Sequence, residues 1–360
     1  MLYNGFYKSM SKVNIIILNW NNWGHTLRCL ATLFQSTYEN YNVILVENGS
    51  TDISLQKIRE WIEGRIMAGA KILSDHPNAK PSKVYEYIHP DILSIQDVEE
   101  PVAKSLTIIK VEKNVGFARG CNLGITYALK DKTVEYILTL NNDMEIARDC
   151  VSLLVAEADS DKNVGACQAK VLLSETQGFI DGVGVNVTWY GCPELVGHGK
   201  ADQGQYSRGY KIFGAYPATA LFRKEMIKDI GLFDEDFFVY FEDVDLCLRA
   251  RKSGWTTVLV PSAISYHFHS ATYGKHSPEK MYYIVRNLLF YGIKNLPFPA
   301  LMFFLILYYP KVVLTNIISS WKDIKALNAI MRGVKDGLFR IPHFWKKRKV
   351  LLRSTGHKVK

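Results

Sequence analysis

The chain has 360 residues, of which 48% are hydrophobic and 22% charged, which excludes a disordered low-complexity chain and indicates a globular fold with an ample core. Its formal net charge is +9, but residues 311–360 hold thirteen Lys or Arg against Asp323 and Asp336, a net of +11, which leaves about −2 for the first 310 residues. The basic excess therefore indicates a partner for the tail rather than for the fold.

The cysteines follow no pairing pattern. They contain no C-x-x-C pair and no zinc-like spacing, and they stand at positions 29, 121, 150, 167, 192 and 247. This scatter favours reduced thiols over a disulfide framework. The opening stretch MLYNGFYKSMSK has no long apolar core of the kind found in signal peptides. We therefore expect a cytoplasmic location.

Strand and helix patterns alternate over the first 145 residues. Continuous apolar, β-branched runs predict strands buried on both faces, at 13–19, at 41–52 with a polar end, at 106–114 and at 136–140. Helices are predicted between them, at 25–36, at 54–64 with Ser50 or Thr51 as its cap, and at 115–130. This order predicts an α/β fold with a doubly wound, mainly parallel sheet.

Each predicted strand ends in polar residues. They are Asn19, Glu47, Asn48, Asn114, Asn142 and Asp143. A single "NND" is ordinary turn sequence, but the carboxyl ends of parallel strands lie on one edge of a sheet, where open α/β sheets bind ligands. Four polar ends on one edge predict a binding crevice.

Two later stretches depart from this rhythm. Residues 64–106 are predicted to be an irregular surface insertion, because they are longer than a usual connection. Farther on, a helix is predicted to begin near Phe241, with acids in its first turn and bases in its last turn, as the helix dipole favours. Dipole matching alone is one explanation of those acids. Arg249 follows Asp245 by four residues, which predicts an ion pair.

Five motifs together resemble the family 2 glycosyltransferases, in particular the rhamnosyltransferase-like enzymes of bacterial and archaeal surface polysaccharides. They are VILVENGSTD, NVGFARGCNLG, LTLNND, GKADQGQY and FDEDFFVYFEDVDLCLRARKSGW. The resemblance covers residues 12–290 and implies a GT-A fold, with a Rossmann-like donor nucleotide half at 12–145 and an acceptor half at 146–290. It implies an inverting transfer of a sugar, with rhamnose as a candidate, from a dTDP- or UDP-linked donor to a lipid-linked or polysaccharide acceptor.

The resemblance also assigns a metal site. A nucleotide diphosphate leaves with negative charge, which calls for a divalent cation, Mg²⁺ or Mn²⁺. Asp143 matches the last acid of the family's DXD element, and His267 matches a metal or diphosphate ligand, although a structural histidine is the alternative. Asn142 stands where many members have Asp, which lowers the expected metal affinity. Glu145 is a second candidate ligand.

The donor site and the base follow from the same resemblance. Glu47 matches the acid that faces the pyrimidine N3–H, Asp52 matches a later acid of that motif, and Arg119 is placed near the diphosphate. The other donor-binding candidates are Asn19, Asn48, Asn114, Gly116, Asn122 and Asn142. Asp243 matches the general base that takes the acceptor proton. Glu242 would orient the acceptor or raise the pKa of the base by like-charge proximity.

Two rival functions come from other classes. One is a non-catalytic, membrane-associated scaffold that binds a nucleotide sugar or a glycan. The other is a nicotinamide oxidoreductase, which fits worse because no G-x-G-x-x-G follows the first strand.

The C-terminal region, 291–360, is predicted to be helical, amphipathic and membrane-associating. Residues 296–309 are fourteen apolar residues, about 21 Å as a helix against a hydrocarbon core of about 30 Å, and Pro310 and Lys311 are expected to interrupt any longer span. We expect peripheral attachment to the anionic inner face of the cell membrane and no nucleic-acid partner. A transmembrane span and a core helix with a nucleic-acid-binding tail are the alternatives.

Overall fold

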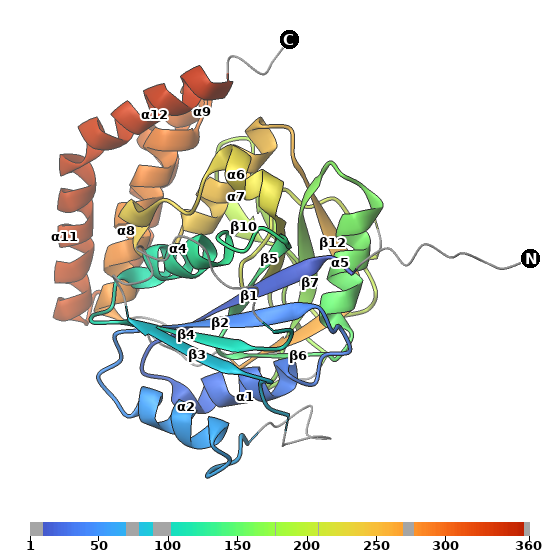
Figure 1. Cartoon of the computed structure of the whole chain (residues 1–360). Helices are drawn as coiled ribbons and strands as arrows, with labels where there is room; N and C mark the ends of the chain where they lie inside the picture. Colours follow the sequence, from blue (N-terminus) through green and yellow to red (C-terminus); the bar gives the residue numbers. More distant parts are fainter. Residues whose placement is uncertain are drawn as a thin grey trace, which may run out of the picture.

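The protein is described here from a computed structural model, which describes residues 10–69, 79–88, 102–176, 178–207, 209–268 and 277–355. A ten-stranded sheet forms its centre, in the order β3-β4-β2-β1-β5-β11-β7-β12-β6, with β8 on β7 (Figure 1). Its strands are β1 (Lys12–Asn19), β2 (Tyr41–Asn48), β3 (Val84–Ile88), β4 (Leu106–Val111), β5 (Val134–Asn141), β6 (Met144–Ile146), β7 (Val164–Leu173), β8 (Ile180–Gly182), β11 (Thr219–Arg223) and β12 (Thr256–His267). A separate hairpin pairs β9 (Val185–Val187) with β10 (Pro193–Leu195).

The strand directions confirm the predicted doubly wound sheet. Strands β3, β4, β2, β1 and β5 are parallel, β11 runs antiparallel between β5 and β7, and β12 is parallel to β7. Two reversals restore the first direction, so β5, β7 and β12 end on the same edge of the sheet. The pairing of Asn19 with Glu47 and of Leu18 with Asn141 sets the polar strand ends side by side.

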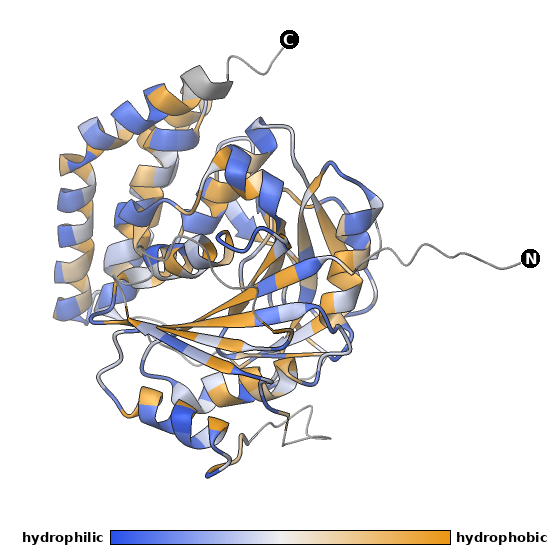
Figure 2. Ribbon diagram, in the orientation of Figure 1, coloured by the Kyte–Doolittle hydropathy of each residue, from blue (hydrophilic) through white to orange (hydrophobic). Residues whose placement is uncertain are grey.

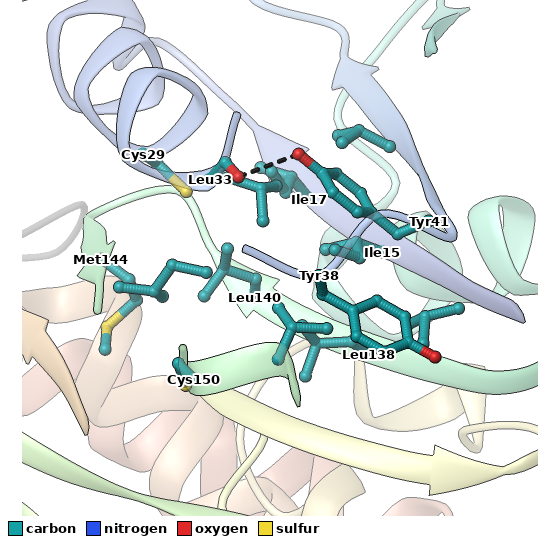
Figure 3. Packing of buried hydrophobic residues seen from close by; sticks show 14 of the residues in the cluster. Ile15, Ile17, Cys29, Leu33, Tyr38, Tyr41, Leu138, Leu140, Met144 and Cys150 are labelled. Atoms are coloured by element: carbon teal, nitrogen blue, oxygen red, sulfur yellow. Dashed lines mark hydrogen bonds between the residues drawn. The ribbon is translucent and has the colours of Figure 1, made fainter. Parts of the chain in front are cut away.

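Helices cover both faces of the sheet, as Figure 1 shows. One face carries α1 (Trp23–Leu33), α2 (Ser54–Ile62) and α5 (Cys150–Ser160), and the other carries α4 (Gly116–Ala128), α6 (Lys224–Ile230) and α7 (Glu242–Lys252). The middle parts of the central strands are hydrophobic (Figure 2), because they are buried on both sides. On the first face, Figure 3 shows Ile15 and Leu138 packed with α1, where Tyr41 Oη donates to Leu33 O at 3.0 Å.

Two predictions about the donor half were wrong. Part of the expected insertion, Val84–Ile88, is the parallel edge strand β3, a short and half-exposed strand whose side chains give little apolar signal. Residues 70–78 and 89–101 of the insertion lie outside the described residues. Helix α2 is not capped by Ser50 or Thr51. It begins after Ile53, because Ser50 Oγ is used by Asn19 and Asn21 instead.

The C-terminal region is helical, as predicted. It comprises α8 (Pro278–Asn295), α9 (Phe298–Phe303), a π-helical turn (Phe304–Tyr308), α10 (Tyr309–Ser319), α11 (Ile324–Phe339) and α12 (Ile341–Thr355). Helices α11 and α12 pack against α8 (Figure 1).

The expected helix break at Pro310 and Lys311 was wrong. The π turn just before Pro310 absorbs the missing N–H of the proline, so one helix runs over Phe298–Ser319. This helix has 22 residues, a mean hydropathy of 1.8 and only 17% of its most apolar window buried. By length and composition alone it is the one helix among the described residues that is able to cross a membrane.

Candidate active site

The ends of β1, β2 and β5 are joined by side-chain hydrogen bonds. Asn19 Nδ2 donates to Glu47 Oε1 at 3.4 Å and to Ser50 Oγ at 3.2 Å, and Glu47 Oε1 also accepts from the Ser50 backbone N–H at 3.0 Å. Thr26 Oγ1 donates to Asn19 Oδ1 at 2.7 Å and accepts from Asn142 Nδ2 at 2.9 Å. The predicted gathering of polar strand ends on one edge is therefore confirmed.

The end of β2 also bonds to the loop before α4. Asn48 Nδ2 donates to Asn114 Oδ1 at 3.1 Å, and Asn48 Oδ1 accepts from the Val115 N–H at 3.1 Å. Gly116 has φ +86°, and a Cβ there would lie 2.6 Å from the Phe238 ring. Only glycine allows this close approach between the α4 loop and the segment before α7.

These residues border a cavity of about 220 Å³, the strand-end pocket. Its lining is Leu18, Trp20, Asn48, Asn114, Gly116, Phe117, Asn141, Asn142, Asp143, Phe238, Val239 and Tyr240. Five of the predicted site residues are therefore brought together here, namely Asn48, Asn114, Gly116, Asn142 and Asp143. Asn19 and Glu47 are buried behind this lining and orient it.

Besides Asn19 and Glu47, three more predicted donor residues do not line the pocket. Asn122 uses its amide to bond Phe233 N, Phe233 O and Glu235 Oε1 at 2.9–3.0 Å, so its position in α4 makes it a structural link rather than a donor contact. Arg119 faces Glu235 at 3.7 Å and is half exposed. Asp52 Oδ1 accepts from the Ser54 N–H at 2.9 Å, at the start of α2.

A second cavity of about 400 Å³, the acid-lined pocket, adjoins the first. The first turn of α7 gives it Glu242 and Asp243, and its other lining residues are Phe117, Asn141, Val185, Pro193, Glu194, Leu195, Tyr216, Pro217, Val239, Tyr240, Phe241, Val244 and Ile284. The two pockets share Phe117, Asn141, Val239 and Tyr240. A ligand in one pocket therefore lies next to a ligand in the other.

Burial raises the pKa values of both acids in the acid-lined pocket. It raises the pKa of Asp243 to about 6. It raises the pKa of Glu242 well above its usual range, and the charge of Asp243 adds to that rise. No described residue donates to the buried Glu242 Oε2. Burial therefore disfavours the ionised form of both acids, and the charge of Asp243 disfavours it further at Glu242. The prediction that Glu242 raises the pKa of Asp243 by its charge is replaced by burial as the cause.

Asp245, the third acid of α7, is structural. Arg249 Nε bonds to it at 2.9 Å, which confirms the predicted ion pair, and Lys294 Nζ and Asn295 Nδ2 reach its other oxygen at 2.7 and 2.9 Å. Burial disfavours its charge, but the two cations hold the pKa of Asp245 well below its usual range.

Asp143 and His267 meet at the sheet edge, although 124 residues separate them in the chain. The Phe268 N–H donates to Asp143 O at 3.0 Å, and His267 Nε2 lies 3.3 Å from Asp143 Oδ1. His267 Nδ1 bonds to Asp181 Oδ2 at 2.7 Å. Burial lowers the pKa of His267, but the bonds to the two aspartates outweigh it and raise the pKa to about 10.

The protein offers few ligands for a cation beside Asp143 and His267. Within the described residues, no group of three or more His, Cys, Asp or Glu side chains forms a ready-made metal site. Asp143 is at the pocket lining with His267 beside it, whereas Glu145 is fully buried in β6 and does not line the pocket. A carboxylate, together with an imidazole whose proton the cation would displace, suits a hard divalent cation whose remaining ligands are phosphate oxygens and water. Asp181, the orienting partner of His267, was missed because nothing in the GFIDG sequence marks it.

The segment before α7 was also missed as a structural feature. Phe238, Tyr240 and Phe241 have φ of +67°, +69° and +71°, a left-handed conformation that non-glycine residues rarely adopt. Residues 238–241, here called the aromatic loop, form the wall shared by the two pockets. The run of aromatic residues in FFVYFED marks the loop, but its backbone conformation is not readable from that run.

Comparison with known proteins gives matches in sequence and in fold. The family model described as "Glycosyl transferase family group 2" matches residues 136–329, more than half of the chain. The model described as "Glycosyl transferase family 2" matches residues 14–73. The low-salt glycan biosynthesis hexosyltransferase Agl10 of Haloferax volcanii is 27% identical over 144 residues, 39% of this chain and 44% of that protein. The dTDP-rhamnosyl transferase RfbF of Shigella flexneri is 24% identical over 196 residues, 52% of this chain and 63% of that protein. The matched stretch thus spans less than two thirds of either relative.

A solved structure confirms the fold. The mannosyltransferase PcManGT from Pyrobaculum calidifontis, in complex with GDP-Man and Mn²⁺, superposes with a TM-score of 0.51 at 16% identity, over 98% of this chain and 88% of that one. The family matches, the relatives named as hexosyl and rhamnosyl transferases and the shared architecture agree with the motifs. This chain therefore belongs to glycosyl transferase family group 2 and has the GT-A fold.

Proposed function

We propose that the protein carries out a metal-assisted, inverting transfer of a hexosyl unit from a nucleoside-diphosphate sugar to a lipid-linked glycan. The observation that carries this proposal is the pair of adjoining pockets, one bordered by Asp143 and the other by Asp243, with Tyr240 in the wall between them. Inverting transfer needs donor and acceptor on opposite sides of the anomeric carbon. Two pockets that meet at one wall support that arrangement.

The strand-end pocket is the proposed donor site. Asn48 and Asn114 line this pocket and are proposed to face the ribose or the phosphates, and Gly116 lets Phe238 close the same wall. Glu47 is our candidate for reading the pyrimidine N3–H from the base end of the crevice, with its Oε1 held by Asn19 and Ser50. The dTDP-linked donor in the name of RfbF supports a dTDP- or UDP-sugar, with rhamnose as the candidate sugar.

A divalent cation, Mg²⁺ or Mn²⁺, would be held by Asp143 and His267. It would supply neutralisation of the charge that develops on the leaving diphosphate. Asn142 adds no charge to this site and is engaged with Thr26 at 2.9 Å. The protein donors are therefore few, and the cation should bind much more tightly when the donor diphosphate is present.

Asp243 is the proposed general base in the acid-lined pocket. Its pKa of about 6 makes it ionised at neutral pH and still able to accept a proton from an acceptor hydroxyl. Glu242 beside it is proposed to orient the acceptor by hydrogen bonding.

An apolar surface adjoins the acid-lined pocket and supports a lipid-linked acceptor. Residues of β10 line that pocket, and the tip of the same hairpin carries Trp189, whose ring lies 5.0 Å from that of Phe303 in α9. Trp189 is 74% exposed, and the helix Phe298–Ser319, which contains Phe303, exposes further large apolar side chains, namely Met302, Ile306, Leu307, Leu314 and Ile318. Lys311 is the one charged residue in the sequence of this helix.

We propose that this surface contacts the cytoplasmic face of the cell membrane, as a peripheral attachment. The exposed Lys322 and Lys325 follow the helix and suit an anionic lipid surface. The tail does not act as one basic patch, however, because Arg340, Lys347 and Arg348 are bonded within the protein. The proposed division is a donor half at 12–145, an acceptor half at 146–290 and a membrane-associating region at 291–360.

The direct test is turnover with a panel of nucleotide sugars, Mn²⁺ and polyprenyl-diphosphate-linked glycans. We expect release of dTDP or UDP that requires both the acceptor and the cation, and that EDTA abolishes. Tight donor binding without release in any combination would instead support the non-catalytic scaffold.

A further inference from the structure

The aromatic loop is held by side chains of α8. Asn287 Nδ2 donates to the carbonyl oxygens of Phe237, Val239 and Tyr240 at 2.7, 2.7 and 3.1 Å. The neighbouring Arg286 Nη2 donates to Phe237 O at 2.9 Å and to Asp236 O at 3.2 Å. Left-handed backbone at non-glycine residues persists only where the surroundings hold it, and these bonds are such a hold.

The base of the loop is held a second time, by the C-terminal helix. The carboxylate of Asp236, in the short 3₁₀ turn Glu235–Phe237 before the loop, receives Arg340 Nη2 at 2.6 Å, His343 Nε2 at 2.6 Å and Lys347 Nζ at 2.5 Å. Lys347 also reaches Asp234 Oδ1 at 2.5 Å. More than a hundred residues separate α12 from this turn in the chain.

Apolar packing reinforces the charged contacts. Phe344, on the same helix as Lys347, is fully buried and stacks on Phe290 of α8 with ring centroids 4.0 Å apart. Its ring also lies 5.9 Å from that of Phe237, edge to face. The α12 helix is thus packed directly against the turn from which the aromatic loop begins.

The ionisation state of Asp236 favours a stable contact with the basic residues around it. Burial disfavours ionisation of this carboxyl, but hydrogen bonds from Lys347, His343 and Arg340 outweigh that effect and hold the pKa of Asp236 well below its usual range. The carboxylate therefore stays ionised and paired across the physiological pH range.

We propose that Arg340, His343 and Lys347 are positioning residues of the transferase, which act through Asp236 to fix the aromatic loop and, with it, the first turn of α7 that carries Asp243. The structural link is short, because only residues 238–242 separate the clamped turn from the base. This set of contacts between Asp236 and Arg340, His343 and Lys347, here called the clamp, would fix the position of the aromatic loop between donor and acceptor without contact with the donor. This inference rests on the proposed role of Asp243 as the base.

The test compares Arg340→Ala/Lys347→Ala with the control Lys346→Ala/Lys349→Ala, whose lysines lie on the same helix, are exposed and take no part in these pairs. We expect the first variant to lose about 10-fold to 100-fold in kcat, as for a small displacement of a reacting group, with the donor KM within about twofold of wild type. We expect backbone amides of residues 238–243 to exchange hydrogen faster while those of β1 and β5 keep wild-type protection. The control variant should match wild type in each measurement.

Two further variants separate positioning from general stability. Lys347→Arg should restore most of the kcat that Lys347→Ala loses, and adding Arg340→Ala/Lys347→Ala to Asp236→Ala should cost little more than Asp236→Ala alone. Additive losses, unchanged loop exchange or faster exchange over the whole sheet would overturn the proposal. The exchange measurement needs no turnover, so an inactive wild-type protein would refute the proposed function while the clamp is still tested.

Discussion

The polar strand ends and the aromatic loop both line the strand-end pocket, but different parts of the fold hold them in place. The pocket side chains stand at the ends of strands, and the register of the sheet places them, as in the pairing of Asn19 with Glu47. The aromatic loop has no such register. Its left-handed backbone depends on Asn287 in α8 and on the contacts of Asp236 with α12. Donor binding is therefore expected to be robust, and transfer to be sensitive to distant changes.

The largest expected effect is at the base. Asp243→Asn should lower transfer by about 10²–10⁴-fold, the usual scale for a general base, and leave donor affinity nearly unchanged, because Asp243 is outside the strand-end pocket. Single-turnover kinetics with a donor titration measure both quantities. Wild-type turnover in this variant would place the base elsewhere and remove the contrast between the two pockets.

Asp143 offers the matching test on the donor side. Asp143→Ala should weaken Mn²⁺-dependent nucleotide binding by about 10-fold or more, because it removes the carboxylate ligand of the proposed site. Titration calorimetry with and without EDTA measures the effect. Asn142→Asp should have the opposite effect on cation affinity, because it adds a second carboxylate to the site. Equal binding by all three proteins with and without EDTA would rule out the metal site.

Asn287 tests whether the loop depends on its support. Asn287→Ala removes a donor from one buried carbonyl, that of Phe237, and from two partly buried ones, those of Val239 and Tyr240. A buried carbonyl left without a donor costs about 1–3 kcal/mol, so we expect a lower melting temperature together with about a tenfold loss of kcat. Asn48→Ala at the strand ends is the comparison variant. It should raise the donor KM and leave kcat less affected. The reverse pattern in the two variants would contradict the difference between the two regions.

Activity and thermal stability should depend on pH in opposite directions through the ionisation of Asp243. Because the base must be ionised, kcat/KM should fall below about pH 6, the pKa of Asp243. A folded-state pKa raised above the usual value of about 3.9 means that the contribution to stability is full below that value and is lost as the pH rises through about 6. Asp243→Asn should therefore melt at a higher temperature than wild type at pH 8, with a smaller difference at pH 5. Scanning calorimetry at the two pH values checks this sign.

The smallest effect on chemistry is expected at the apolar surface. Trp189→Glu/Ile306→Asp should reduce flotation with anionic vesicles and leave turnover on a soluble acceptor unchanged, because both side chains are mostly exposed. Met67→Asp, at another exposed apolar residue, is the control. Because the Debye length is only about 8 Å at physiological ionic strength, wild-type binding that survives high salt would show that apolar contact dominates. Equal flotation of all three proteins would exclude this surface. A truncation after Asn295 is a poor substitute, since it also removes α12 from Asp236.

Sequence patterns predicted the sheet, its direction and the polar edge, because buried parallel strands are read from apolar runs and their ends share one edge. They did not predict β3, whose half-exposed side chains carry little apolar signal, or the helix through Pro310, where a π turn removes the usual conflict. In the site, the acids and amides were visible as motifs. Asp181 and Asn287 were not, because their roles depend on which distant backbone or side chain they meet. The same reason explains why Asn122 was assigned to the donor but bonds Phe233 instead.

The antiparallel strand β11 bears on how the chain folds. It fills the space between β5 and β7 and pairs with both, although it is made from residues 219–223, well after the donor half has ended. A nascent or truncated chain that stops near residue 145 would leave one side of β5 with its backbone donors and acceptors unpaired along a buried, apolar strand. We therefore expect the donor half to need β11 to complete its fold. Its release from the ribosome before β11 is made would expose an edge prone to self-association.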